Sequence, residues 1–349
     1  METIIFEKIV KKNKRRQFIK TVGASILAIF VLLIIGYKGL NELTKTHGED
    51  IKDRYLLLSE IAYPNIDYSN WHFNVTSQFA GVFESHRYKN IDGIEVPFEP
   101  YQGYYSLGGN LDNNNDSEYL LEGDNGQSSY THGSHYKVPR FYNINFNYNE
   151  DSYNQLTQDI TYVSDLNGEA VEVAITFDKP YTYDEIKTMI PDNLMINWYW
   201  IGTTSDLDTV NFQPKDLFGM TDYQQIYKES KEVPFEEIYN SFIKYLKSGL
   251  YNQWISGNYS RENDSLEETE GNSNFTEEKM NTDKNNYFDV KEDVQNFISN
   301  NPDSKTAKFS GVILTGRSEN FEALKNKEWI YASNIGQTVE IRPYHHLTK

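Results

Sequence analysis

An uncharged apolar segment near the N-terminus constrains this chain more than any other feature. Residues 21–37 read TVGASILAIFVLLIIGY, and further apolar residues lie just beyond the flanking Lys20 and Lys38. A helix of about 20 apolar residues crosses a hydrocarbon core of about 30 Å. A helix is required there because lipid offers no hydrogen-bond partners to the backbone. The sequence therefore predicts a transmembrane helix over residues 18–40.

A cleaved signal peptide has the same order of basic and then apolar residues. Its apolar core is usually about 7–15 residues long and precedes a cleavage site of small residues. The segment here is longer and ends IIGYKGLNEL, without such a site, and the chain has no cysteine for lipid attachment. We therefore expect an uncleaved anchor rather than a cleaved signal or a buried helix of a soluble protein.

Charge is distributed unevenly on the two sides of this segment. The chain has a formal net charge of −18, yet residues 1–20 contain seven Lys or Arg and only two Glu. Basic residues before a span keep that end in the cytoplasm, so residues 1–17 are expected inside and the chain from residue 41 outside. Such a basic tail attracts lipid head groups or an acidic cytoplasmic partner. The residues expected to set topology and to form this partner tail are Lys11, Lys12, Lys14, Arg15, Arg16 and Lys20.

Composition and motifs argue against catalysis. The absence of cysteine excludes disulfides, thiolate metal sites and cysteine nucleophiles. No G-x-S-x-G elbow or glycine-rich phosphate loop occurs. The acidic outer part lacks the basic face that nucleic-acid binding requires. We therefore expect no enzyme activity, no catalytic residues, no cofactor and no direct contact with nucleic acid.

Two patterns suggest a metal site only weakly. Residues 112–123 have the alternating Asp/Asn spacing of a calcium loop, but Ser117 stands at its glycine position and Gly123 at its glutamate position. His132 and His135 are close in sequence, but no H-E-x-x-H motif is present. We therefore expect no metal ligands.

The region after the span is expected to begin with a helix and continue with strands. Residues 41–64 have helical spacing and are expected to form a neck. Residues 65–150 are rich in aromatic and β-branched residues, and Asn90–Gly93 is typical of a hairpin turn. Within this β-rich extracytoplasmic region, we expect a surface loop or loop pair over 108–135 and a strand over 137–148.

Residues 151–349 are expected to form a mixed α/β domain. A strand at 169–177 ended by Pro180, a helix at 183–189 capped by Thr182, and a strand at 194–201 are typical of a βαβ unit, intact or split. Further expected elements are helices at 235–250, 290–298 and 318–326, the last capped by Ser318, and strands at 308–315 and 329–341. The polar insertion 256–284 is expected to be disordered. The fold class is thus an α+β ectodomain on a single N-terminal transmembrane helix.

Two segments, 169–200 and 309–344, carry a resemblance to a known family. The residues that carry it are Phe177, Pro180, Trp198, Trp200, Gly311, Gly316, Ser333 and Gly336. In these positions the chain resembles the C-terminal domain of the Firmicutes sigma factor regulators, membrane proteins similar to the anti-sigma-M regulator of Bacillus. The basic run, span and neck resemble the N-terminal segment of that family.

The resemblance implies a single-pass anti-sigma factor of a Gram-positive cell envelope. Its partner would be an extracytoplasmic-function sigma factor or a second membrane regulator, and its outer domain would sense the envelope. Members usually place a folded sigma-binding segment before the span, whereas a helix of 17 residues extends only about 25 Å and forms no core of its own. We expect that this segment folds on its partner, that the protein is a degenerate paralogue, or that a second protein performs the cytoplasmic role.

The residues leave two other function classes open. The aromatic strands would suit an extracytoplasmic module that binds cell-wall polymer or peptide and has no role in transcription. An envelope hydrolase would need two carboxylates positioned across a cleft, which sequence spacing does not reveal.

Overall fold

The computed structural model describes residues 2–112, 120–123, 129–131, 135–148, 155–221, 233–260 and 287–349. The chain forms two compact units. The first unit contains residues 1–52, 73–83 and 102–113, and the second contains residues 53–72, 84–101 and 114–349. The predicted disordered insertion lies outside the described residues from residue 261 to its end.

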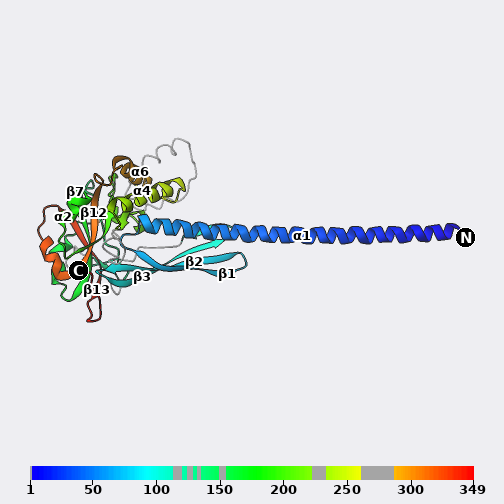
Figure 1. Cartoon of the computed structure of the whole chain (residues 1–349), viewed down its shortest axis with the longest axis horizontal. Helices are drawn as coiled ribbons and strands as arrows, with labels where there is room; N and C mark the ends of the chain where they lie inside the picture. Colours follow the sequence, from blue (N-terminus) through cyan, green and yellow to red (C-terminus); the bar gives the residue numbers. More distant parts are fainter. Residues whose placement is uncertain are drawn as a thin grey trace, which may run out of the picture. The chain divides into compact units, whose positions relative to one another are not determined.

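A single helix, α1 (Glu2–Ile61), covers the predicted tail, span and neck without interruption (Figure 1). The first proline of the chain is Pro64, so nothing in residues 2–61 interrupts the backbone hydrogen bonding of a helix. Among the described residues, α1 is the one helix long and apolar enough to cross a membrane, with a mean hydropathy of 2.5 in its most apolar window and none of that window buried.

The β-rich region following α1 is a four-stranded sheet in the order β1-β2-β3-β4. Its strands are β1 (Asp67–Ser77), β2 (Ala80–Ile91), β3 (Ile94–Ser106) and β4 (Gly109–Asp112). Asp92 and Gly93 connect β2 to β3 with φ angles of 54° and 91°, the left-handed conformation that a tight hairpin turn needs. The predicted hairpin turn at residues 90–93 is confirmed.

Two local predictions in this region were wrong. The expected loop over 108–135 contains β4 and the paired strands β5 (Leu120–Glu122) and β6 (Ser129–Thr131); the remainder of that loop lies outside the described residues. The expected strand at 137–148 is absent. Side chains hold its backbone instead: Arg140 N donates to Asn334 Oδ1 and Tyr142 N donates to Thr176 Oγ1, each over 3.0 Å.

A five-stranded antiparallel sheet in the order β13-β7-β12-β8-β9 forms the centre of the second unit. Its strands are β7 (Glu169–Thr182), β8 (Met195–Trp200), β9 (Gly219–Thr221), β12 (Lys308–Arg317) and β13 (Ile330–Glu340). The short helix α2 (Tyr183–Met189) connects β7 to β8 and begins with a capping box between Thr182 and Glu185. Because β12 lies between β7 and β8, the split form of the βαβ prediction is correct.

Pro180 does not end β7, contrary to the prediction. The pairing of β7 with β12 passes from Tyr181↔Phe309 to Thr176↔Gly311, so residues 177–180 form a bulge. A residue in a bulge needs no ladder hydrogen bond from its N–H, and proline is therefore tolerated there.

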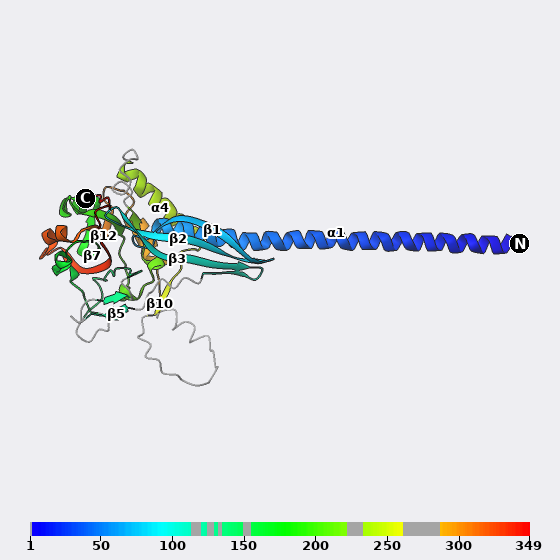
Figure 2. The ribbon, with the colours of Figure 1, turned by 90° about the horizontal axis from the view of Figure 1, so that it is seen from below.

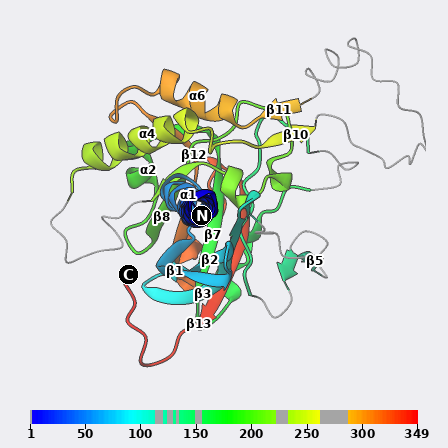
Figure 3. The same ribbon diagram turned by 90° about the vertical axis from the view of Figure 1, so that its right-hand side faces the viewer.

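Two helices, α4 (Phe235–Tyr251) and α6 (Lys291–Asn300), lie side by side (Figure 3). The ring of Phe297 in α6 packs against Phe309 of β12 at a centroid distance of 5.9 Å. The predicted helix at 318–326 is instead a 3-10 helix, η6 (Ser318–Leu324), with Arg317 rather than Ser318 as its N-cap. The other elements are η2 (Asp159–Thr161), η3 (Val163–Asp165), η4 (Thr209–Asn211), η5 (Pro214–Asp216), β10 (Asn258–Ser260) and β11 (Tyr287–Asp289).

One large apolar core unites these elements of the second unit. It includes the last turns of α1, through Leu58 and Ile61, the two tryptophans of β8, and the inner faces of α4 and α6. Together with the four-stranded sheet and the single apolar helix, this core confirms the predicted α+β ectodomain on one N-terminal helix.

Candidate functional site

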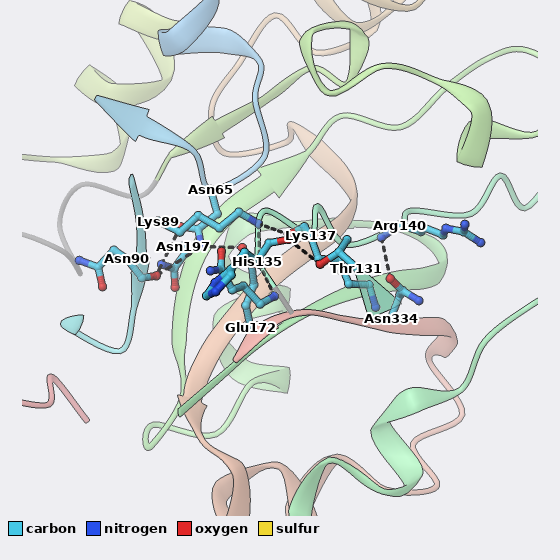
Figure 4. Close-up of polar contacts among 11 residues, drawn as sticks. Asn65, Lys89, Asn90, Thr131, His135, Lys137, Arg140, Glu172, Asn197 and Asn334 are labelled. Atoms are coloured by element: carbon cyan, nitrogen blue, oxygen red, sulfur yellow. Dashed lines mark hydrogen bonds and ion pairs between the residues drawn. The ribbon is translucent and has the colours of Figure 1, made fainter. Parts of the chain in front are cut away.

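A fully buried ion pair joins β2 to β7 in the second unit (Figure 4). Lys89 Nζ lies 2.7 Å from Glu172 Oε2, and neither side chain is exposed to solvent. The same ammonium group donates to the carbonyl oxygen of Lys137 over 2.8 Å. Removing two charges from water costs several kcal/mol per ion, and only good geometry with further hydrogen bonds offsets that cost.

Further donors satisfy the Glu172 carboxylate. Asn65 Nδ2 donates to Oε1 over 2.7 Å, and the backbone N–H of Gln337 donates to Oε2 over 3.0 Å. Gly336 provides the space, because a Cβ at that position would overlap Glu172 Oε2. Gly336 was singled out in the sequence only because it matched the family resemblance. The structure shows that the ion pair needs a residue without a Cβ at this position.

A chain of side chains extends from the ion pair to the β2–β3 turn. Asn197 Nδ2 donates to Asn65 Oδ1 over 2.9 Å and to the carbonyl oxygen of Asn90 over 2.8 Å. Thr315 Oγ1 donates to Asn197 Oδ1 over 2.7 Å and accepts from the N–H of Asp92 over 3.1 Å. We call the set Lys89, Glu172, Asn65, Asn197 and Thr315 the buried junction.

Burial also perturbs titration around the junction. Burial lowers the pKa of Lys89, and the adjacent Glu172 carboxylate partly opposes this effect. Burial lowers the pKa of Lys137 to about 8, although the negative charge of Asp159 acts in the opposite direction and raises it. The members of the junction are closed to solvent, so their chemistry suits holding β2 against the large sheet rather than acting on a substrate.

Sequence comparison places both sides of this junction in one family. Residues 163–337 match the sigma factor regulator C-terminal domain, and residues 7–96 match the sigma factor regulator N-terminal domain. The chain belongs to the sigma factor regulator family. No curated protein and no solved structure matches it significantly. The family and the candidate membrane helix found among the described residues together indicate a single-pass membrane protein of the anti-sigma-factor type.

The buried junction of this regulator links the two matched regions. Asn65 and Lys89 lie in the N-terminal match, and Glu172, Asn197 and Thr315 lie in the C-terminal match. None of these five residues was predicted from the sequence as a site residue. The available signal was Glu172 within the otherwise apolar run 170–175, but the acidic composition made single carboxylates uninformative, and Lys89 lies in a strand with several other polar residues.

Three residues that carried the resemblance meet around one aromatic ring. The ring of Phe141 stacks on Trp200 at a centroid distance of 4.8 Å and lies 5.8 Å from Trp198. Gly311 borders the same ring, because a Cβ there would lie 2.9 Å from it. Phe141 lies outside the two segments that carried the resemblance and was not predicted as a core residue.

The other resemblance residues are spread through the fold of the regulator. Phe177 packs edge-on against Trp329 at 5.8 Å. A Cβ at Gly316 would lie 2.7 Å from Leu194. Ser333 Oγ accepts from the N–H of Ile160 over 2.9 Å. The basic tail residues are separate from all of these and are exposed along α1: Lys11, Lys12, Lys14, Arg15, Arg16 and Lys20.

Pro180 borders a polar pocket of about 450 Å³ in the second unit. Its lining is mostly hydroxyl and amide groups, including Thr203, Thr204 and Asn296. The buried wall residue Asp293 accepts from Thr204 N over 2.5 Å and from Thr204 Oγ1 over 2.9 Å. Burial raises the pKa of Asp293 to about 6, although these hydrogen bonds stabilise the carboxylate and act to lower the pKa. Such a lining suits a neutral polar ligand.

No group of three or more His, Cys, Asp or Glu within the described ranges is placed to hold a metal ion. Most of the calcium-like pattern at 112–123 lies outside those ranges, as does His132.

Proposed function

We propose that this protein is a non-enzymatic, membrane-anchored anti-sigma factor that restrains an extracytoplasmic-function sigma factor according to the state of the envelope. Its N-terminal tail lies in the cytoplasm, because six basic residues precede the span at residue 18 and Lys20 follows near its start. Its outer part contains the junction and the polar pocket. Membership of the sigma factor regulator family supports the regulatory role.

The tail offers a surface suited to a protein partner, and this observation carries the proposal. Phe6, Ile9 and Val10 are 68 %, 53 % and 36 % exposed on α1. Their i, i+3, i+4 spacing places them on one face of the helix. Helices with apolar anchors at this spacing bind in hydrophobic grooves of partner proteins. A short tail can therefore bind a sigma factor as a docked helix without a core of its own.

The same helix connects this tail to the outer core. Leu58 and Ile61 of α1 belong to the core of the second unit, and no proline interrupts the helix between the tail and these residues. An envelope signal can act on the tail only if it changes the relative free energies of two states of the assembly. In our proposal the two states differ in how the outer part holds the end of α1.

The decisive experiment measures sigma-dependent transcription with a reporter gene. Replacing Phe6 and Ile9 together by alanine should release the sigma factor and raise reporter output to the level of a strain lacking the regulator. Lys8→Ala is the matched control, because Lys8 lies on the same turn but outside the apolar face, and it should leave output unchanged. Unchanged transcription in the double variant at normal protein abundance would refute the tail as the binding element.

A second candidate function is an extracytoplasmic module that binds cell-wall peptide or glycan, and the polar pocket beside Asp293 favours it. Its test is sedimentation of the purified chain with cell-wall fragments. Retention that is lost in Asn296→Leu, combined with no transcriptional effect of the Phe6 and Ile9 substitutions, would favour this function over the first.

A further inference from the structure

Two segments of the first unit contain no charged residue. They are 73–83 (FNVTSQFAGVF) and 102–111 (QGYYSLGGNL). Charged residues make up 24 % of the chain, so about five charges would be expected in segments of this combined length. The first segment is one of the sheet portions that belong to the first unit, and the second is the other portion, 102–113, up to the residue before Asp112. One end of the four-stranded sheet therefore differs in composition from the rest of the acidic domain.

The β1–β2 turn of this sheet contacts α1 where the apolar segment ends. Gln78 Nε2 donates to Tyr37 Oη over 2.6 Å. The rings of Phe79 and Tyr37 meet edge-on at a centroid distance of 5.9 Å. Tyr37 is the last residue of the uncharged segment and Lys38 follows it. These contacts place the turn at the level where α1 leaves the hydrocarbon core.

The β3–β4 turn contacts α1 farther along the helix. His47 Nδ1 lies 2.7 Å from the carbonyl oxygen of Ser106, and Asn110 Nδ2 donates to Asp50 Oδ2 over 2.7 Å. At 1.5 Å per residue, His47 is about 15 Å beyond Tyr37 along α1. Within the first unit the strands therefore run beside the helix (Figure 2), and the β1–β2 turn contacts α1 closer to the apolar segment than the β3–β4 turn does.

Apolar side chains are exposed at this end of the sheet. Val75 is 79 % exposed, Leu111 is 64 % exposed and Tyr104 is 42 % exposed. Val75 also borders an open groove of about 320 Å³ between the sheet and α1. Exposed apolar side chains in uncharged segments are consistent with contact with a membrane or a protein.

We propose that the β1–β2 turn, residues 77–80, is a membrane-contact element that lies in the lipid head-group layer. The partner is the bilayer that α1 crosses, because the turn is attached to the helix at the end of the span. Aromatic rings such as those of Tyr37 and Phe79 favour this interface. The absence of charge matters since an acidic surface would be repelled by anionic lipids. This contact would fix the orientation of the four-stranded sheet relative to the bilayer, on whichever side of the membrane the sheet lies.

The test uses the natural absence of cysteine, because one introduced cysteine is then the only thiol. The full-length chain would be reconstituted in nanodiscs of phosphatidylglycerol and phosphatidylethanolamine with a spin label at Phe79→Cys or Ser77→Cys. Leu107→Cys, in the β3–β4 turn, is the matched control. Collision rates with oxygen, which concentrates in lipid, and with a water-soluble nickel chelate report depth. The nickel-to-oxygen ratio should be several-fold lower at positions 77 and 79 than at 107.

Two results would overturn the proposal. One is a nickel-to-oxygen ratio at position 79 equal to that at 107 in a protein with an unchanged melting temperature. The other is dipolar broadening between labels at position 79, since it would show a second copy of the chain against the turn in place of lipid. If Phe79→Cys fails to fold, the exposed position 77 gives the same comparison.

Discussion

Lys89 and Glu172 are 83 positions apart in the chain, yet their charged atoms lie 2.7 Å apart inside the protein. Lys89→Met would leave the Glu172 carboxylate buried without its cation. The free energy of unfolding, measured by urea titration with tryptophan fluorescence, should fall by about 3–5 kcal/mol. The exposed Lys247→Met is the control and should change it by less than about 0.5 kcal/mol. A loss as small as the control's would mean that the pair contributes nothing to stability.

Gly336 acts on the same carboxylate through space. Gly336→Ala would place a methyl group against Glu172 Oε2, and overpacking of this kind typically costs about 1–3 kcal/mol. Gly108→Ala is the control, because the nearest heavy atom to a Cβ there is Ser106 Oγ at 3.7 Å. The cost should shrink when Lys89→Met is already present, since both changes disturb one group. Fully additive costs would contradict the steric explanation.

Titration of Asp293, in the wall of the polar pocket, should make the stability of the folded protein depend on pH. Its pKa is raised by burial from 3.8 to about 6, so its stabilising contribution is fully present below pH 3.8 and is lost as the pH rises through 6. The loss is at most about 3 kcal/mol at about 1.4 kcal/mol per pKa unit. Asp293→Asn cannot ionise, so its melting temperature relative to the wild type should rise between pH 4 and pH 7. The exposed Asp184→Asn should show no such trend, and a flat difference for Asp293→Asn would contradict the assignment.

At the scale of elements, local chemistry decides where α2 begins. Thr182 Oγ1 accepts from the N–H of Glu185, and the Glu185 carboxylate accepts from the N–H of Thr182. Thr182→Ala should lower the free energy of unfolding by about 1 kcal/mol, measured by urea titration. Thr188→Ala, on the same helix but away from the cap, serves as the control and should cost less. Equal losses would show that the cap has no special role.

The strand β7 shows where local rules were overridden. Pro180 was expected to end it, but the bulge opposite β12 accommodates a residue without an N–H, and the strand continues to Thr182.

In segment 137–148, by contrast, a predicted strand does not form. Its alternating aromatic pattern predicted a strand, but side chains of Thr176 and Asn334 take the hydrogen bonds that a neighbouring strand would have supplied.

At the scale of the whole molecule, the proposed topology has a direct test. In intact cells, a membrane-impermeant maleimide should label Ser260→Cys and leave Asn13→Cys unlabelled until the membrane is permeabilised. Basic residues before the span are the physical reason, because they resist translocation. Because the chain contains no cysteine, the unsubstituted protein is the blank. Labelling of position 13 in intact cells would reverse the proposed orientation and remove the cytoplasmic role of the tail.

The periodic elements and the span were predictable from sequence alone. Residues close together in the chain are enough to specify four of these features: the apolar segment 21–37, the amphipathic helix α4, the hairpin turn at 90–93 and the capping box of α2. Their causes are hydropathy, period and turn chemistry, which act over a few residues. The family resemblance added the core positions Trp198, Trp200 and Gly311 without saying what they contact.

The buried junction was decided only by the tertiary structure. Lys89 looks like any strand lysine, and Glu172 is one of 51 acidic residues. Their burial, the space left by Gly336 and the insertion of β12 between β7 and β8 depend on contacts between residues far apart in the chain. The sequence by itself determined a membrane helix, an α+β outer part and the class of regulator. The tertiary structure decided which polar residues leave water, because burial belongs to the packed chain and not to any single segment.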